Sequence, residues 1–155
     1  TPFGMESEST VKKRIFSFLL VFALLGNLTC SFAAGPEDLQ PYASDYLDSY
    51  AIGVNAKGGC VMSVTFIVYG TDTMDKIGAQ KIVVEEWDGA NWGNPMTYTA
   101  KKNSNFLTTN ASGYTASVTF YGLPGLQYRA TLYAYAELDG VFDMGTVTSN
   151  PETCI

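Results

Sequence analysis

Residues 113–136, GYTASVTFYGLPGLQYRATLYAYA, decide the fold because two alternating stretches flank a turn. In residues 114–121 and again in 128–136, the even-numbered residues are apolar or Tyr, and most of the odd-numbered ones are polar. This period of two is typical of a β-strand with one buried and one exposed face. Between the stretches, Pro124-Gly125 interrupts strand pairing, because Pro has no N–H and Gly tolerates a positive φ. The stretch therefore predicts two strands joined at a corner.

The first 33 residues are expected to be a signal peptide. Lys12-Lys13-Arg14 is a basic segment, residues 15–28 are mostly apolar, and Ser31-Phe32-Ala33 supplies small residues for cleavage after Ala33. Met5 is a plausible initiator, which leaves residues 1–4 as upstream read-through. The alternative is a retained membrane anchor, although the apolar run is shorter than the ~20 residues that a span needs. The protein is accordingly expected to be secreted.

The chain after residue 33 is acidic. It keeps six of the nine basic residues and thirteen of the fifteen acidic ones. An acidic surface without a basic stripe argues against nucleic acid and anionic lipid as partners. Residues 34–49 contain four acids and two prolines and are expected to be an acidic leader before the fold; a calcium site there is the weaker alternative.

Residues 50–155 are expected to form one all-β domain. Seven strands at short spacing are typical of a Greek-key sandwich. The predicted strands are residues 50–56, 60–69, 79–87, 92–101, 114–121, 128–136 and 141–149. The predicted core consists of Val64, Phe66, Ile82, Val84, Val118, Phe120, Tyr128 and Leu132.

Two turns stand out between these strands. In residues 70–78, Met74 and Ile77 are spaced by three, which predicts one helical turn, capped by Asp72 or Thr73, that covers one end of the sandwich. The functional alternative makes Asp72 and Asp75 ligands or catalytic acids. Residues 88–91, Asp-Gly-Ala-Asn, predict a hairpin that brings Trp87 and Trp92 together across the strands.

Cys60 and Cys154 are the two cysteines that remain after cleavage, and they are candidates for a disulfide in an oxidising compartment. With strands that alternate in direction, the start of strand 60–69 and the end of strand 141–149 lie at the same pole. The alternative is two unrelated thiols.

Two parts of the sequence resemble known protein families. Pro124-Gly125 followed by Tyr128 resembles the tyrosine corner of immunoglobulin-like and fibronectin type III sandwiches. Residues 70–78 also match the pattern Gly-Thr-x-Thr-Met-Asp-x-Ile-Gly, and residues 117–130 match Ser-Val-Thr-x-x-Gly-x-x-Gly-x-x-Tyr-Arg-Ala. Both patterns resemble an uncharacterised family of small secreted proteins of Gram-positive bacteria.

The family resemblance spans residues 58–148 and implies export and a sandwich, but no activity. The chain departs from the family at Trp87, Trp92, Cys60 and Cys154, so no role of these residues is carried over. The fibronectin comparison holds only at the corner, where Gly122 stands in place of an apolar residue.

The most frequent general acid–base residue of enzymes, histidine, is missing from the sequence. The chain contains no His, which excludes His-based bases, ligands and triads. Nucleotide-binding and nucleophile motifs are also absent, so neither an enzyme nor a cofactor is expected. Glu85, Glu86 and Asp88 leave a two-carboxylate glycoside hydrolase as the least favoured alternative.

Aromatic residues supply the candidate binding site. Trp87, Tyr133 and Tyr135 have outward parity on strands expected to share a sheet, and Trp92 lies opposite Trp87. These four rings are expected to contact a glycan or a surface protein. The alternative is a structural or envelope-associated domain in which the rings brace the hairpin and cover the sheet.

Overall fold

The computed structural model describes residues 40–41 and 44–155. The predicted signal peptide, residues 1–33, lies outside the described residues. The described part is an all-β sandwich of two antiparallel sheets, which confirms the predicted fold class at this level. No helix among residues 40–41 and 44–155 has the length and apolarity that a membrane span requires.

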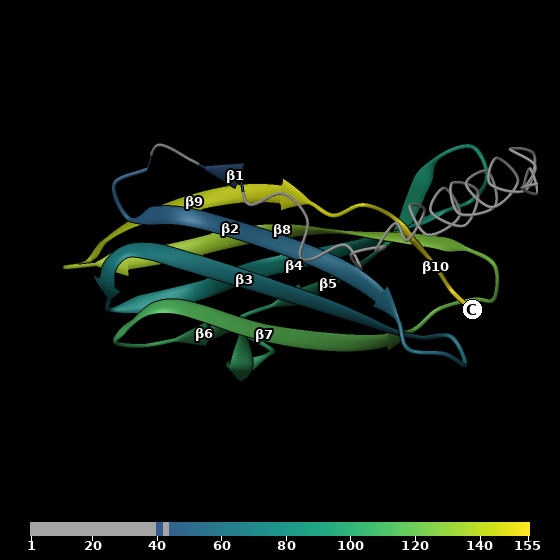
Figure 1. Cartoon of the computed structure of the whole chain (residues 1–155), viewed down its shortest axis with the longest axis horizontal. Coiled ribbons are helices and arrows are strands. Elements are labelled where there is room, and N and C mark those ends of the chain that lie inside the picture. Colours follow the sequence, from purple (N-terminus) through teal and green to yellow (C-terminus); the bar gives the residue numbers. More distant parts are fainter. Residues whose placement is uncertain (1–39, 42–43) are drawn as a thin grey trace, which may run out of the picture. The chain divides into compact units, whose positions relative to one another are not determined.

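The first sheet has the strand order β1-β2-β3-β7. It consists of β1 (Gln40–Pro41), β2 (Leu47–Ala56), β3 (Val61–Met74) and β7 (Ala111–Tyr121). In Figure 1 the long strands β2, β3 and β7 form the front layer.

The second sheet has the order β10-β8-β4-β5, with β9 also paired to β8 and β6 to β4. Its strands are β4 (Lys76–Trp87), β5 (Trp92–Thr99), β6 (Leu107–Thr108), β8 (Gln127–Leu138), β9 (Val141–Thr148) and β10 (Glu152–Thr153). A 3-10 turn, Ser104–Phe106, precedes β6 and buries Phe106 in the core.

Alternate residues of the long strands fill the space between the sheets. On β3, Met62, Val64, Phe66 and Val68 are buried, and on β8 every even-numbered residue from Tyr128 to Ala136 is buried. Seven of the eight predicted core residues are buried, and Val118 is half-buried. Val118 stays partly accessible because β7 is the edge strand of its sheet. The period of two therefore identified the inward face correctly.

The predicted helical turn in residues 70–78 is wrong. Strand β3 runs to Met74 and β4 begins at Lys76, so Asp75 alone separates the two strands. Met74 and Ile77 are nevertheless fully buried, as the prediction required. Their spacing of three arises because the chain crosses here from one sheet to the other, which turns both side chains into the core.

Strand β2 begins at Leu47, three residues before the predicted start at Tyr50. Leu47 is fully buried, and Gln40–Pro41 pairs with Ser49 and Tyr50. Residues of the expected acidic leader, 34–49, thus contribute to the edge of the first sheet.

The corner between β7 and β8 has the hydrogen bond expected of a tyrosine corner. The hydroxyl of Tyr128, at the start of β8, accepts a hydrogen bond from the backbone N–H of Leu123 at 2.8 Å. Gly125 supplies the positive φ, 79°, that the turn requires. A side chain at Gly122 would lie 2.7 Å from the Tyr128 ring, which explains why glycine stands where an apolar residue was expected.

The predicted Cys60–Cys154 disulfide is present, with Cα atoms 5.0 Å apart. Backbone hydrogen bonds surround it: Cys60 N–H donates to Ile155 O at 3.0 Å, and Cys154 N–H donates to Leu126 O at 2.9 Å. The end of the chain is therefore fixed to the beginning of β3 and to the tyrosine corner.

Candidate functional site

The outer face of the second sheet carries all four predicted binding residues. Because successive strand residues point to opposite faces, the buried even-numbered residues of β8 leave the odd-numbered ones outside. Tyr133 and Tyr135 are therefore outward on β8, and Trp87 pairs with Trp92 across β4 and β5. As expected, β4, β8 and β9 are neighbours in this sheet.

The two tryptophans form a cluster with Glu85 and Arg129, called here the tryptophan cluster. The Trp87 and Trp92 ring centroids are 5.4 Å apart at an interplanar angle of 50°. The Arg129 guanidinium lies over the Trp92 ring, with Cζ 4.4 Å from its centroid. Arg129 also forms an ion pair with Glu85, with 2.9 Å between Nη2 and Oε2. The rings are thus half-buried and held by a cation–π contact.

Asp88 fixes the hairpin that presents this cluster. Its carboxylate oxygen Oδ1 accepts hydrogen bonds from the backbone N–H groups of Asn91 at 2.7 Å and Ala90 at 2.8 Å. These two bonds, the Asn91 bond foremost, lower the pKa of Asp88 below its usual value. The charged carboxylate therefore has a structural role at the turn.

The tyrosines lie near the opposite end of the sheet. Lys81 Nζ is 3.7 Å from the centroid of the Tyr133 ring. Tyr135 stacks on Phe142, with ring centroids 5.6 Å apart and planes at 23°. The Tyr135 hydroxyl donates a hydrogen bond to Glu137, which also accepts one from Lys76.

The Tyr135–Glu137 contact shifts the pKa of both groups. Partial burial, followed by the hydrogen bond to Glu137, raises the pKa of Tyr135 to about 12. The same hydrogen bond, with help from Lys76, lowers the pKa of Glu137. At neutral pH the arrangement therefore holds a neutral phenol against an ionised carboxylate.

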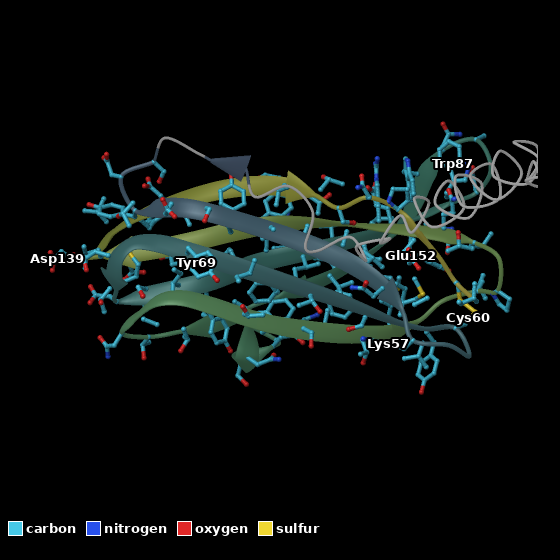
Figure 2. All side chains as sticks on the ribbon, viewed as in Figure 1. Lys57, Cys60, Tyr69, Trp87, Asp139 and Glu152 are labelled. Atoms are coloured by element: carbon cyan, nitrogen blue, oxygen red, sulfur yellow. A yellow bond between two sulfur atoms is a disulfide. The ribbon has the colours of Figure 1, made fainter. Side chains whose placement is uncertain are left out.

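The register of β4 against β8 places the tryptophans and the tyrosines at different points along the strands. Trp87 pairs with Gln127 of β8, whereas Tyr133 pairs with Lys81 of β4. At ~3.3 Å per residue, Gln127 and Tyr133 are roughly 20 Å apart along the strand. Figure 2 shows the same separation, with Trp87 near one end of the sandwich and Asp139, which follows β8, at the other.

The surface between the two aromatic ends is formed by small residues. Val83 and Thr131 pair at this point, flanked by Thr97 on β5 and Thr148 on β9. The structure therefore brings Trp87 to Trp92, and Tyr133 close to Tyr135, but it does not bring the two pairs together.

Sequence reasoning missed two exposed residues on β9. Phe142 and Met144 have 55% and 47% of their surface exposed. Phe142 lies opposite Glu137 and Met144 opposite Tyr135, so both extend the tyrosine end of the outer face. The alternation of Phe142, Met144 and Thr146 was visible in the sequence and could have placed these residues on one face of the strand, but it could not show that this face is exposed. Tyr135, Phe142 and Met144 are called here the β8–β9 patch.

The carboxylates proposed for a glycoside hydrolase are all engaged in structural contacts. Glu85 pairs with Arg129, Asp88 caps the hairpin, and Glu86 accepts a hydrogen bond from Asn94. A general acid needs a raised pKa, and the pKa of Asp88 is lowered. Among the described residues, no group of three or more His, Cys, Asp or Glu side chains has an arrangement that could hold a metal ion.

Comparisons with protein-family models, with curated proteins and with solved structures found no match to this chain.

Proposed function

We propose that the protein is an exported, non-catalytic binding module with a seven-stranded, immunoglobulin-like Greek-key fold. The strand order supports this fold: β2-β3-β7 corresponds to the A-B-E sheet of fibronectin type III domains, and β5-β4-β8-β9 corresponds to C′-C-F-G. The tyrosine corner at Leu123 and Tyr128 supports it further. Fold alone does not give a function, which depends on the residues that the surface presents.

The single observation that carries the binding function is the placement of Trp87, Trp92, Tyr133 and Tyr135 on one outer face. Other residues hold two of these rings in place: Arg129 lies over the Trp92 ring, and Lys81 lies over the Tyr133 ring. Such fixed aromatic side chains lose little conformational entropy on binding, and they dominate the energy of many interfaces.

Export is part of the proposal. The basic and apolar segment at residues 12–28 is the argument from sequence. The Cys60–Cys154 disulfide is consistent with it, because disulfides persist in oxidising compartments.

The resemblance to small secreted proteins of Gram-positive bacteria also belongs to the proposal. Its loop motif has a structural explanation in this chain, since Met74 and Ile77 are core residues. A side chain at Gly78, whose φ is +144°, would lie 2.1 Å from the backbone oxygen of Phe106. Other proteins with this fold would need apolar residues at the positions of Met74 and Ile77 and a glycine at that of Gly78 for the same reasons.

Binding of the purified protein to an array of defined glycans and to surface proteins tests the function. We expect at least one ligand, with a Trp87→Ala, Tyr133→Ala double variant weaker by about tenfold or more. Tyr121→Ala is the matched control, because Tyr121 is 84% exposed and lies on the other sheet. No binding by the wild type, or equal binding by the double variant, would contradict the proposal.

A structural or envelope-associated domain is the second candidate. The observation that favours it is that Arg129 and Trp87 already contact the Trp92 ring, so the cluster braces the β4–β5 hairpin. This reading predicts no ligand in the same array, together with loss of stability in the double variant.

A further inference from the structure

The β8–β9 patch is the most exposed apolar surface on the outer face of the second sheet. Phe142 is 55% exposed and Met144 47%. The stacking of Tyr135 on Phe142 holds the centre of the patch in one geometry. Monomeric proteins seldom leave such a surface bare without a use for it.

Carboxylates gather at the same end of the sandwich as this patch. Asp139 forms the β8–β9 turn, and its N–H donates to Asp75 at 2.8 Å. Asp143 accepts a hydrogen bond from the Tyr46 N–H at 2.8 Å, which brings the segment before β2 to the same end. The acidic residues of this end are Asp45, Asp48, Asp72, Asp75, Glu137, Asp139 and Asp143. Glu137 and Asp139 lie next to the patch, whereas Asp143, opposite the buried Ala136, lies on the other face of β9.

The nearest basic side chains are already engaged. Lys76 lies 2.9 Å from Glu137, and Lys81, further along β4, lies against the Tyr133 ring. The end of the sandwich that carries the patch therefore keeps an excess of negative charge.

We propose that the β8–β9 patch is the docking surface for a basic, apolar segment of a partner protein. This inference rests on the proposed binding function and assigns its partner class. The patch takes the partner's large apolar side chains, and the carboxylates of this end, called here the acidic rim, attract its Lys and Arg residues.

Other occupants fit less well. A second copy of this chain would bring two acidic rims together, and like charges at an interface oppose association. A glycan would stack on open aromatic rings, whereas Tyr135 is half-buried beneath Phe142 and Met144 adds an aliphatic contact.

The test measures binding of fluorescent amphipathic peptides to the purified protein. One probe combines Leu with Lys, a second has Glu in place of Lys, and a third has Ser in place of Leu. We expect the Leu–Lys peptide to bind, with the other two weaker by about tenfold or more. Raising the salt concentration should weaken binding of the Leu–Lys peptide, because exposed charges are screened.

Two variants locate the site. Phe142→Ser combined with Met144→Ser should lower affinity for the Leu–Lys peptide about tenfold, whereas Tyr121→Ser, a more exposed control on the other sheet, should not. Asp48→Asn, Asp72→Asn and Asp139→Asn together should weaken binding and reduce its salt dependence. Asn suits position 139 because Asp139 has a φ of +52°.

The outcomes separate this inference from the proposed function. Equal binding of the Leu–Glu peptide, or unchanged binding by the Phe142→Ser, Met144→Ser variant, overturns the inference. If the Trp87→Ala, Tyr133→Ala variant alone loses the peptide, the binding function stands and the docking surface lies elsewhere. Dimerisation of the wild type that increases with concentration and is lost in the Phe142→Ser, Met144→Ser variant would show that a second copy of this chain occupies the patch. That result would also overturn the inference.

Discussion

At the scale of single residues, Gly145 shows how closely the two sheets approach. A Cβ at this position would lie 2.4 Å from the hydroxyl oxygen of Tyr50, whose side chain is fully buried. The Tyr50 ring has little room to move aside, because it is packed inside the core. Glycine is therefore required here by packing.

We expect Gly145→Ala to lower the free energy of unfolding by about 1–3 kcal/mol, the usual cost of overpacking a core. Urea denaturation measures the change. Gly53→Ala on β2 is the control, because its Cβ would meet only Asn55 Nδ2, at 3.8 Å. Equal stability of the two variants would show that the Tyr50 ring can move aside.

The sequence alone could not identify the role of Gly145. Its contact, Tyr50, is distant in the chain and reaches it only after the sheets have packed. By contrast, the inward positions of β3 and β8 were predictable, since they follow from the period of two within each strand. Exposure of Phe142 and Met144 depends on whether another element covers β9, and a strand pattern does not contain that information.

At the scale of elements, the β4–β5 hairpin depends on one carboxylate. Asp88 holds the N–H groups of Ala90 and Asn91 while the two tryptophans stack on the strands beside it. Removing the carboxylate leaves these two donors without the acceptor that sets the turn.

We expect Asp88→Ala to loosen the hairpin, with faster hydrogen exchange at the Ala90 and Asn91 amides and a weaker circular-dichroism signal from the tryptophan pair. Asp88→Asn should retain most of the signal, because its side-chain oxygen can still accept both bonds. An unchanged signal in the alanine variant would mean that the Trp92–Arg129 contact alone holds the hairpin.

The crossing from β3 to β4 shows where element prediction failed. Two apolar residues spaced by three fit a helical turn, and they also fit a chain that leaves one sheet and enters the next. Only the pairing of Met74 with Ala111 and of Ile77 with Ala136 distinguishes the two, and both pairings are non-local. The Asp-Gly-Ala-Asn hairpin was predictable because its determinants are adjacent in sequence.

At the scale of the whole molecule, the disulfide joins residues 94 positions apart. Closing a loop of this length restricts the unfolded chain, which in the chain-entropy account is worth roughly 4–5 kcal/mol. The pairing of Cys60 with Cys154 was predictable from the direction of the strands. The distance between the tryptophans and the tyrosines on the outer face was not, because it depends on the register of β4 against β8.

We expect reduction of Cys60–Cys154 to lower the free energy of unfolding by about 2–5 kcal/mol. Urea denaturation with and without reductant measures it, and a Cys60→Ser, Cys154→Ser variant, which cannot respond to reductant, is the control. Identical midpoints for the oxidised and reduced protein would contradict the expectation.

The position of this bond also determines how the domain would bear a mechanical load. Ile155 follows Cys154 directly, and Figure 1 shows the C-terminus at the end of the sandwich away from the β8–β9 turn. A pull on the C-terminus would pass through the sulfur atoms into β3, at the centre of the first sheet, before it could peel β10 and β9 from β8. Residues 60–154 would therefore resist extension as a closed loop, and a tether at Ile155 would leave the β8–β9 patch at the far end of the sandwich.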